Sequence, residues 1–199
     1  LIDGLALDRC VLFGHSMGGA IATLVAAARP AIVATLVLAE ANVDAGAGII
    51  SGPIAEQTEQ AFTGGGWEAM LADQRRGAVE RGGLPAAHVG IASLVPARAL
   101  HVAATSLTRG STPSVREILR TLPMPRYYLN GARSTASALP PQPDLLASGV
   151  EWRTVPDTGH PMALENPAGL AELLETLLPE ERPADLAPAD RTPGHGRRS

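Results

Sequence analysis

One short run of residues has the composition and spacing of a nucleophilic site. Gly14-His15-Ser16-Met17-Gly18 follows an apolar run at residues 10–13 (CVLF) and precedes small and apolar residues at 17–28 that predict a helix. A sharp turn between a strand and a helix raises the central hydroxyl at the carboxyl end of the strand. Ser16 is therefore the candidate nucleophile. The backbone amide of Met17, at a helix N-terminus, is the candidate oxyanion donor.

A serine hydroxyl needs a base that accepts its proton, because it is a poor nucleophile at neutral pH. Of the five histidines, His160 is the candidate base. It lies between a predicted strand at residues 150–155 and a predicted helix at residues 167–178. His15 lies inside the turn and is interpreted as a packing or hydrogen-bonding residue. Three others are interpreted as structural or solvated histidines: His88, His101 and His195.

The elements that must position these residues predict an α/β fold. Residues 10–13 and 34–39 are continuous apolar runs on either side of the predicted helix at 17–28. Strand, helix and strand with fully apolar strands indicate a parallel sheet that is covered on both faces. Further strands are predicted at residues 125–129 and 150–155. We therefore expect a partial, doubly wound, mostly parallel sheet.

The central section, residues 45–122, has no convincing strand and predicts a helical insertion that acts as a cap. The helical stretches, the last of them capped by Thr112, are residues 54–62, 67–81, 88–107 and 113–119. We expect the two parts of the core at residues 1–44 and 123–178, with Asn166 as N-cap of the closing helix. Residues 179–199 are rich in proline and polar residues, which predicts a disordered tail.

Composition narrows the classes of function. A chain with 45% hydrophobic and 18% charged residues and a net charge of −4 is typical of a soluble globular protein. The arginines are scattered, so no nucleic-acid footprint is predicted, and the apolar runs are too short to span a membrane. Cys10 is the single cysteine, which excludes a disulfide framework and is compatible with the cytoplasm.

The run VLFGHSMGGAIA at residues 11–22 resembles the α/β-hydrolase superfamily. So do Gly159-His160 and the following Glu165-Asn166-Pro167, and the resemblance extends from about residue 1 to 178. It implies a doubly wound sheet with residues 45–122 as a cap domain, the order nucleophile, acid, histidine along the chain, and hydrolysis of a small-molecule substrate, most often an ester. It implies no cofactor and no metal.

The acid that orients the histidine is the least certain member of the set. The superfamily usually places it shortly after the strand read here at 125–129, but residues 130–135 (NGARST) contain no carboxylate, and Ser134 occupies the expected place. Some branches place the acid at the end of the strand that follows the nucleophile helix, where this chain has Glu40. A carboxylate there is costly without a partner, which favours a functional Glu40. Asp44 is the alternative, ahead of Asp144 and Asp157.

The resemblance also implies strands before the nucleophile and a second oxyanion donor from an earlier loop, whereas nine residues precede Cys10. We therefore expect a truncated product or a partial gene model, poorly soluble and nearly inactive when expressed alone. The favoured function is a serine hydrolase acting on a small ester. The alternatives are a non-hydrolytic binding protein of the same fold and, third, an interaction module built on the helical insertion.

Overall fold

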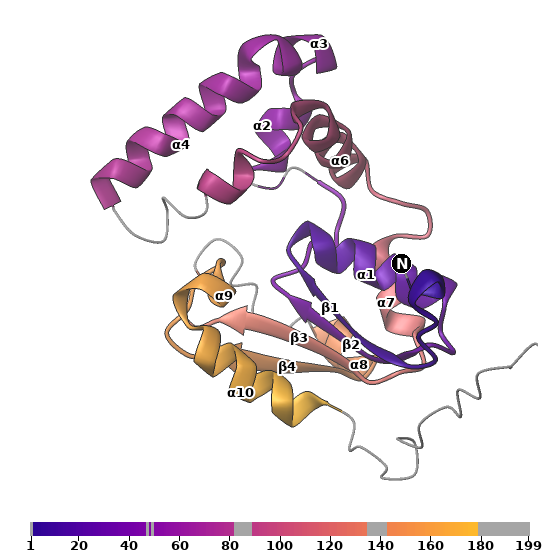
Figure 1. The fold of residues 1–199 in the computed structure, drawn as a ribbon. Coiled ribbons are helices and arrows are strands. Elements are labelled where there is room, and N and C mark those ends of the chain that lie inside the picture. Colours follow the sequence, from indigo (N-terminus) through magenta and orange to yellow (C-terminus); the bar gives the residue numbers. More distant parts are fainter. Residues whose placement is uncertain (1, 47, 49, 82–88, 135–142, 179–199) are drawn as a thin grey trace, which may run out of the picture.

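The structure is a computed structural model that describes residues 2–46, 48, 50–81, 89–134 and 143–178. Four strands form one parallel sheet in the order β1-β2-β3-β4 (Figure 1). They are β1 (Cys10–His15), β2 (Val33–Ala39), β3 (Arg126–Gly131) and β4 (Val150–Val155). The predicted α/β class with a parallel sheet is confirmed.

The register of the strands brings three chain segments to one edge of the sheet. His15, the last residue of β1, pairs with Ala39, the last residue of β2, and Ala39 pairs in turn with Leu129 of β3. Because the strands are parallel, the residues that follow them all leave from the same edge. Ser16 and Glu40 are the first residues beyond β1 and β2, so they emerge side by side.

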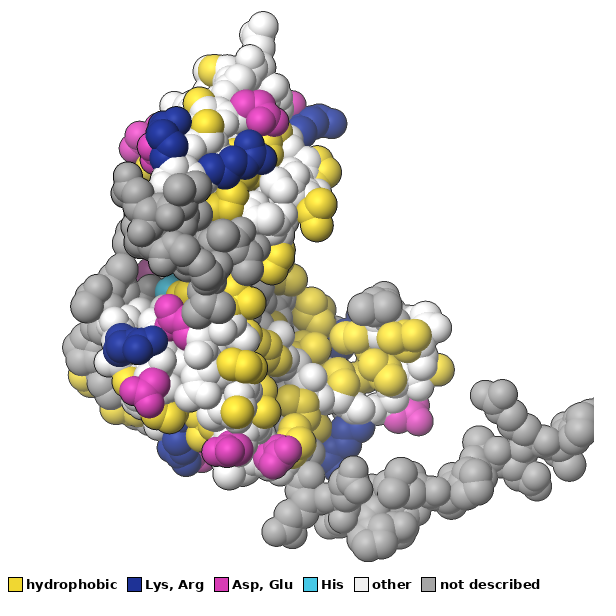
Figure 2. All heavy atoms as spheres, turned by 60° about the vertical axis from the view of Figure 1, so that its left-hand side comes forward, with side chains coloured by type: hydrophobic (Ala, Val, Ile, Leu, Met, Phe, Trp, Pro, Cys, Tyr) yellow, Lys and Arg dark blue, Asp and Glu magenta, His cyan; other side chains and the backbone are white. Residues whose placement is uncertain are grey.

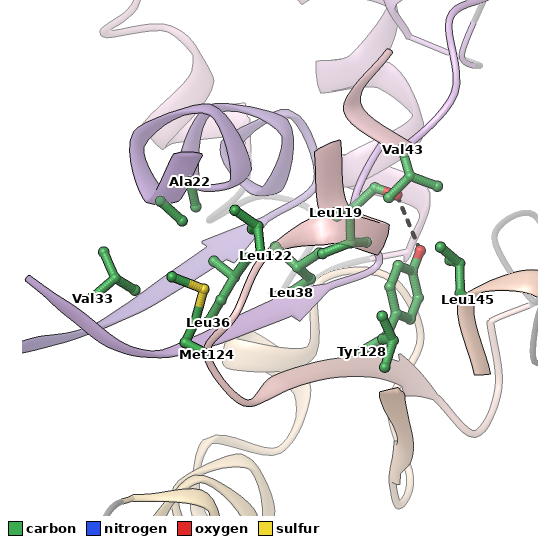
Figure 3. Packing of buried hydrophobic residues seen from close by; sticks show 13 residues of the cluster. Ala22, Val33, Leu36, Leu38, Val43, Leu119, Leu122, Met124, Tyr128 and Leu145 are labelled. Carbon is green, nitrogen blue, oxygen red and sulfur yellow. Dashed lines mark hydrogen bonds between the residues drawn. The ribbon is translucent and has the colours of Figure 1, made fainter. Parts of the chain in front are cut away.

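Alternation along the strands divides the core into two layers. Leu36 and Leu38 pack under α1 (Met17–Ala28), α7 (Val115–Thr121) and α8 (Pro143–Ala147), together with Tyr128 and Leu119 (Figure 3). Their neighbours Val37 and Ala39 point to the opposite face. There they pack against α9 (Met162–Glu165) and α10 (Pro167–Leu177). Side chains in a strand alternate between faces, so a continuous apolar run buries both.

The described residues between β2 and β3 contain helices and no strand. The helices above the carboxyl edge of the sheet are α2 (Ser51–Ala55), α3 (Glu59–Ala61), the π-helical turn η2 (Phe62–Gly66), α4 (Trp67–Arg81) and α6 (Ala97–Arg109) (Figure 1). They have a core of their own, in which Ile54, Phe62, Trp67 and Leu71 are buried. We call these helices the cap helices.

Two details of this section differ from the sequence-based expectation. The stretch 88–107 is not one helix, because the chain is extended at Pro96, where α6 begins. A proline lacks an N–H and disfavours helix in the residue before it, so the break follows from its chemistry. The helix expected at residues 113–119 is α7 (Val115–Thr121), and its N-cap is Ser114 and not Thr112. Ser114 and Glu117 form a reciprocal capping box.

Packing places α7 with the sheet, although it lies within the range 45–122 that the sequence assigns to the insertion. Leu119 of α7 is fully buried against Leu36 and Leu38, and α7 lies next to α1. The division into four ranges otherwise stays a prediction. The tail predicted at residues 179–199 lies outside the described residues, as do His88 and His195.

A short 3-10 helix, η1 (Asp3–Leu5), precedes β1. On the molecular face in Figure 2, arginine and acidic side chains are interspersed over both the cap helices and the sheet body. No basic patch gathers on that face. Within the part of the chain that the structure describes, none of the helices has the length and apolarity to cross a membrane.

Candidate active site

Ser16 lies in a strained turn between β1 and α1. Its φ of 54° and ψ of −125° fall in a region that non-glycine residues rarely adopt, at a cost of about 1–3 kcal/mol. Three backbone hydrogen bonds hold this conformation. The Ser16 amide donates to the Ala39 carbonyl at 2.9 Å, and the Ser16 carbonyl accepts from the amides of Gly19 and Asn42. The turn is therefore fixed by β2 as well as by the start of α1.

Gly14 lets the strand pass directly under the helix. A Cβ at this position would lie 2.5 Å from the Gly18 carbonyl oxygen and 2.7 Å from the Gly19 Cα, both of which are backbone atoms. Gly18 belongs to the same sequence motif but has open space where a Cβ would be. Only the first of these two glycines is required by close packing.

Glu40 and His160 form the central contact of the site. Nδ1 of His160 lies 2.7 Å from Oε2 of Glu40. The Glu40 side chain has no exposed surface, whereas that of His160 is 37% exposed. A carboxylate can only accept, so the Nδ1–H of the imidazole donates, which leaves Nε2 with a lone pair when the ring is neutral. This is the tautomer that a general base for a serine requires.

Two further donors satisfy the Glu40 carboxylate. The Gly131 amide donates to Oε1 at 2.8 Å, and the Ser134 hydroxyl donates to Oε2 at 2.9 Å. Burial acts to raise the pKa of Glu40, but the hydrogen bonds from His160, Gly131 and Ser134 outweigh it and lower the pKa below its usual value. Glu40 is thus ionised at neutral pH.

The loop that carries His160 is tied down at several points. Nε2 of His15 lies 2.8 Å from the His160 carbonyl oxygen, and the two rings are 4.5 Å apart between centroids. The Gly159 amide donates to the Glu165 carboxylate, and the Asn166 side chain donates to the Pro156 carbonyl. His15 therefore joins the turn at Ser16 directly to the backbone of His160.

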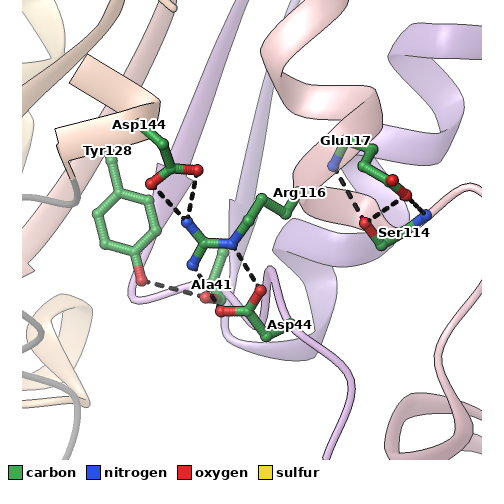
Figure 4. A network of polar contacts seen from close by, with 7 residues as sticks. All are labelled: Ala41, Asp44, Ser114, Arg116, Glu117, Tyr128 and Asp144. Carbon is green, nitrogen blue, oxygen red and sulfur yellow. Dashed lines mark hydrogen bonds and ion pairs between the residues drawn. The ribbon is translucent and has the colours of Figure 1, made fainter. Parts of the chain in front are cut away.

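Asp44 and Asp144 are engaged elsewhere (Figure 4). Both carboxylates bind Arg116 of α7: Asp44 at 2.6 Å through two guanidinium nitrogens, and Asp144 at 3.0 Å. The hydrogen bonds with Asp44 raise the pKa of Arg116 further. Asp157 lies on the surface. Of the four acids considered from sequence, the structure brings Glu40 to the His160 ring.

Ser16, Glu40 and His160 all line one cavity of about 510 Å³. The sheet side of its wall also includes Met17, Asn42 and Tyr128. The cap helices contribute an apolar roof of Ile54, Leu100, Ala104 and Leu107. Met17 begins α1, where the first amides have no carbonyl partner within the helix. In the described part of the chain, no three His, Cys, Asp or Glu side chains are grouped as metal ligands would be.

Sequence reasoning selected Ser16, Met17, Glu40 and His160, and it missed the donors around them. Ser134 was noted only as a residue that cannot carry charge, although its hydroxyl holds Glu40. Gly131 was not singled out, although its amide holds the other carboxylate oxygen. The signal available was position: Gly131 ends the strand next to Glu40 and Ser134 follows it, so both lie where donors can reach the carboxylate. A third histidine, His101, is buried in the cap, with Nε2 2.8 Å from the Gln57 carbonyl oxygen.

Gly14→Ala should destabilise the protein, whereas Gly18→Ala should not. The first places a methyl group against backbone atoms that cannot move away, at a cost of about 1–3 kcal/mol or more. The second replaces a glycine within a helix, which stabilises it by about 0.5–1 kcal/mol. Urea unfolding of the two variants beside the wild type measures both changes. Equal destabilisation by the two substitutions would contradict the role given to Gly14.

Ser134→Ala should raise the pKa of Glu40, because it removes one of the hydrogen bonds that lower it. Ionised Glu40 stabilises the fold above its unfolded pKa, and this contribution is lost as the pH falls through the folded pKa. The loss should therefore end at a higher pH in the variant and be smaller, because the folded pKa lies closer to the unfolded one. Carbon-13 NMR titration of the Glu40 carboxyl measures the shift, with Ser148→Ala as control, since the Ser148 hydroxyl donates to the Leu145 carbonyl of α8 and not to Glu40. If the Glu40 carboxyl titrates in Ser134→Ala as it does in the wild type, the Ser134 hydroxyl does not lower its pKa.

No curated protein sequence matches the chain. In fold it is similar to Est816, described as an N-acyl homoserine lactone degrading enzyme (TM-score 0.59, 23% identity, covering 89% of this chain and 70% of that one). It is also similar to a thermophilic esterase from Thermogutta terrifontis (0.65, 21%, 88% and 67%) and to the enol-lactonase from Burkholderia xenovorans LB400 (0.66, 17%, 88% and 67%). Residues 1–173 match the model of the alpha/beta hydrolase family. The chain therefore belongs to the alpha/beta hydrolase family.

Proposed function

We propose that the protein is a cofactor-independent serine hydrolase that cleaves carboxylic esters or related acyl compounds through an acyl-enzyme. The observation that carries the proposal is the buried Glu40 carboxylate on Nδ1 of His160, in the cavity that Ser16 lines. This contact fixes the tautomer in which Nε2 accepts a proton. A hydroxyl on a strained turn and an oriented imidazole at one cavity are the parts that acyl transfer requires.

In the proposed first half-reaction, Nε2 of His160 accepts the proton of the Ser16 hydroxyl while Oγ bonds to the carbonyl carbon of the ester. The carbonyl oxygen becomes an oxyanion, which the Met17 amide stabilises. The imidazolium then returns the proton to the alkoxy oxygen as its bond to carbon breaks. The alcohol leaves, and the acyl group remains on Ser16.

The second half-reaction repeats these steps with water as the nucleophile. His160 accepts a proton from water, whose oxygen bonds to the acyl carbon, and the proton then passes to Oγ of Ser16 as the acid is released. Each imidazolium forms next to a carboxylate that the three hydrogen bonds keep ionised. Glu40 thus stabilises the charge that develops on His160 without accepting the proton itself.

The alternative of a non-hydrolytic binding protein was motivated by the missing carboxylate after β3. Glu40 supplies a carboxylate to the His160 ring from β2, so this motive no longer applies. The esterase and the two lactone-directed enzymes share the fold, and their descriptions agree with ester chemistry as the reaction class. The cap helices contribute an apolar roof to the cavity, which suits an uncharged acyl or alkyl group.

A fluorophosphonate probe tests the nucleophile. It should label Ser16, because an activated hydroxyl attacks the phosphorus and displaces fluoride. Peptide mass spectrometry locates the adduct, and Ser16→Ala should abolish it. Ser51 lines the same cavity, but it does not stand at the strained turn and is not part of the proposed triad. The matched variant Ser51→Ala should therefore still be labelled at Ser16. A folded protein that stays unlabelled would favour the binding-protein reading.

Glu40→Gln should reduce turnover by about 10³–10⁴, because an amide cannot stabilise the imidazolium and can hold the ring in the wrong tautomer. Asp44→Asn should cost little, since Asp44 contacts Arg116 and not His160. Initial rates on p-nitrophenyl acetate, normalised to the folded fraction that near-ultraviolet circular dichroism gives for each preparation, separate turnover from folding. Reversed effects would move the acid to Asp44.

A further inference from the structure

A second, smaller cavity of about 170 Å³ lies against the candidate active-site cavity. The residues that line both cavities form their common wall: Met17, Asn42, Val43, Asp44 and Leu107. Met17 follows Ser16 directly in the chain, so the wall begins one residue from the candidate nucleophile. Methionine is unbranched and flexible, which makes its side chain suited to a wall that yields to a ligand.

Two adjacent stripes of side chains on α6 line the two cavities. Leu100, Ala104 and Leu107 line the large cavity, at helical spacings of four and three residues. Ala103 and Ser106, one position back from each of the latter two, line the small cavity. Residues three and four apart share a helix face, so α6 presents one stripe to each cavity and Leu107 to both.

On the opposite side, α1 lines the small cavity with Ala20, Ile21 and Leu24, none of which reaches the large one. Apolar side chains of α1 and α6 thus bound the small cavity, and its polar lining residues are Asn42, Asp44 and three serines. The cavity opens to solvent beside α1, where Ile21 and Leu24 are 53% and 42% exposed. For scale, a group the size of benzene fills a cavity of about 150 Å³. The volume therefore matches about six carbon atoms.

The charges near the wall disfavour an anion. Among the described residues that line either cavity, the ionisable ones are Glu40, Asp44, Tyr128 and His160, and none is an arginine. Arg116 binds Asp44 through two of its nitrogens, and Asp144 occupies its third, so its guanidinium is already engaged by two carboxylates. A carboxylate on the substrate would lose its hydration here without gaining a cation.

We propose that the small cavity is a subsite for one uncharged, apolar arm of the ester substrate, about six carbons long, which enters past Met17 and Leu107. The other parts of the substrate occupy the large cavity with the ester at Ser16. This inference rests on the proposed ester hydrolysis and names its substrate class: neutral esters with an apolar arm of medium length, in preference to esters that carry a carboxylate on that arm.

Ala103→Phe tests the subsite, because it fills the small cavity from a position that does not line the large one. The measurement is the ratio of kcat/KM for p-nitrophenyl hexanoate to that for p-nitrophenyl acetate, and the same ratio for hexyl and methyl acetate. A ratio cancels differences in the active fraction. The loss of contacts to four methylenes in the acyl series, or to five in the alcohol series, predicts a fall of about tenfold or more in one of the two ratios, from the transfer free energy per methylene.

Val102→Phe is the matched control, since Val102 neighbours Ala103 on α6, is 52% exposed and lines neither cavity. Its ratios should equal those of the wild type. Ser106→Phe, which is exposed and fills the small cavity from the same stripe, should reproduce the fall if Ala103→Phe does not fold. For the charge, wild-type kcat/KM should be at least tenfold lower for p-nitrophenyl hydrogen adipate than for the hexanoate.

The outcomes separate the two proposals. If the probe labels Ser16 but Ala103→Phe and Ser106→Phe leave the chain-length ratios of both series unchanged, the subsite is overturned and the proposed hydrolase activity stands. A preference for the adipate over the hexanoate overturns the substrate class. Absence of labelling at Ser16 in folded wild-type protein removes the proposed function itself.

Discussion

A carboxylate buried at the end of an apolar strand sets the condition that the rest of the site meets. Glu40 has no exposed side-chain surface, and an ionised group in such a place is costly unless every oxygen has a partner. Its partners come from two segments distant in the chain: Gly131 and Ser134 at the end of β3, and His160 after β4. The fold must therefore bring both loops to the end of β2 before this charge can be buried.

The sheet register meets this condition through the backbone. The Ser16 amide bonds to the Ala39 carbonyl and the Glu40 amide to the Leu129 carbonyl, so each strand fixes the first residue beyond its neighbour. Both residues have positive φ, 54° for Ser16 and 43° for Glu40. Strain of this kind persists only where the surroundings over-determine it. Gly131 completes the arrangement, since a Cβ there would lie 2.5 Å from the Thr158 carbonyl oxygen in the loop before His160.

These relations explain which parts of the molecule could be predicted from sequence. The helix at residues 17–28 and the strand at 150–155 were predicted to the residue, because small apolar runs and breakers such as Pro30 are local signals. The N-cap at Asn166 was local too, and its side chain accepts from the Gly169 amide. The donors to Glu40 were not predictable in the same way. Ser134 lies 94 residues from Glu40, and its role depends on a sheet register that no local pattern specifies.

Glu40 and Asp44 lie four residues apart, and their surroundings decide which of them contacts His160, a choice that the sequence left open. Glu40 is enclosed and accepts from an imidazole, a hydroxyl and an amide, so its charge is directed at His160. Asp44 is half exposed and faces Arg116, which is itself shared with Asp144. A guanidinium with two carboxylates holds the loop after β2 against α7 and leaves Asp44 with a fixed partner. The same loop contributes to the wall between the two cavities, so this ion cluster positions the wall while Glu40 positions the His160 ring.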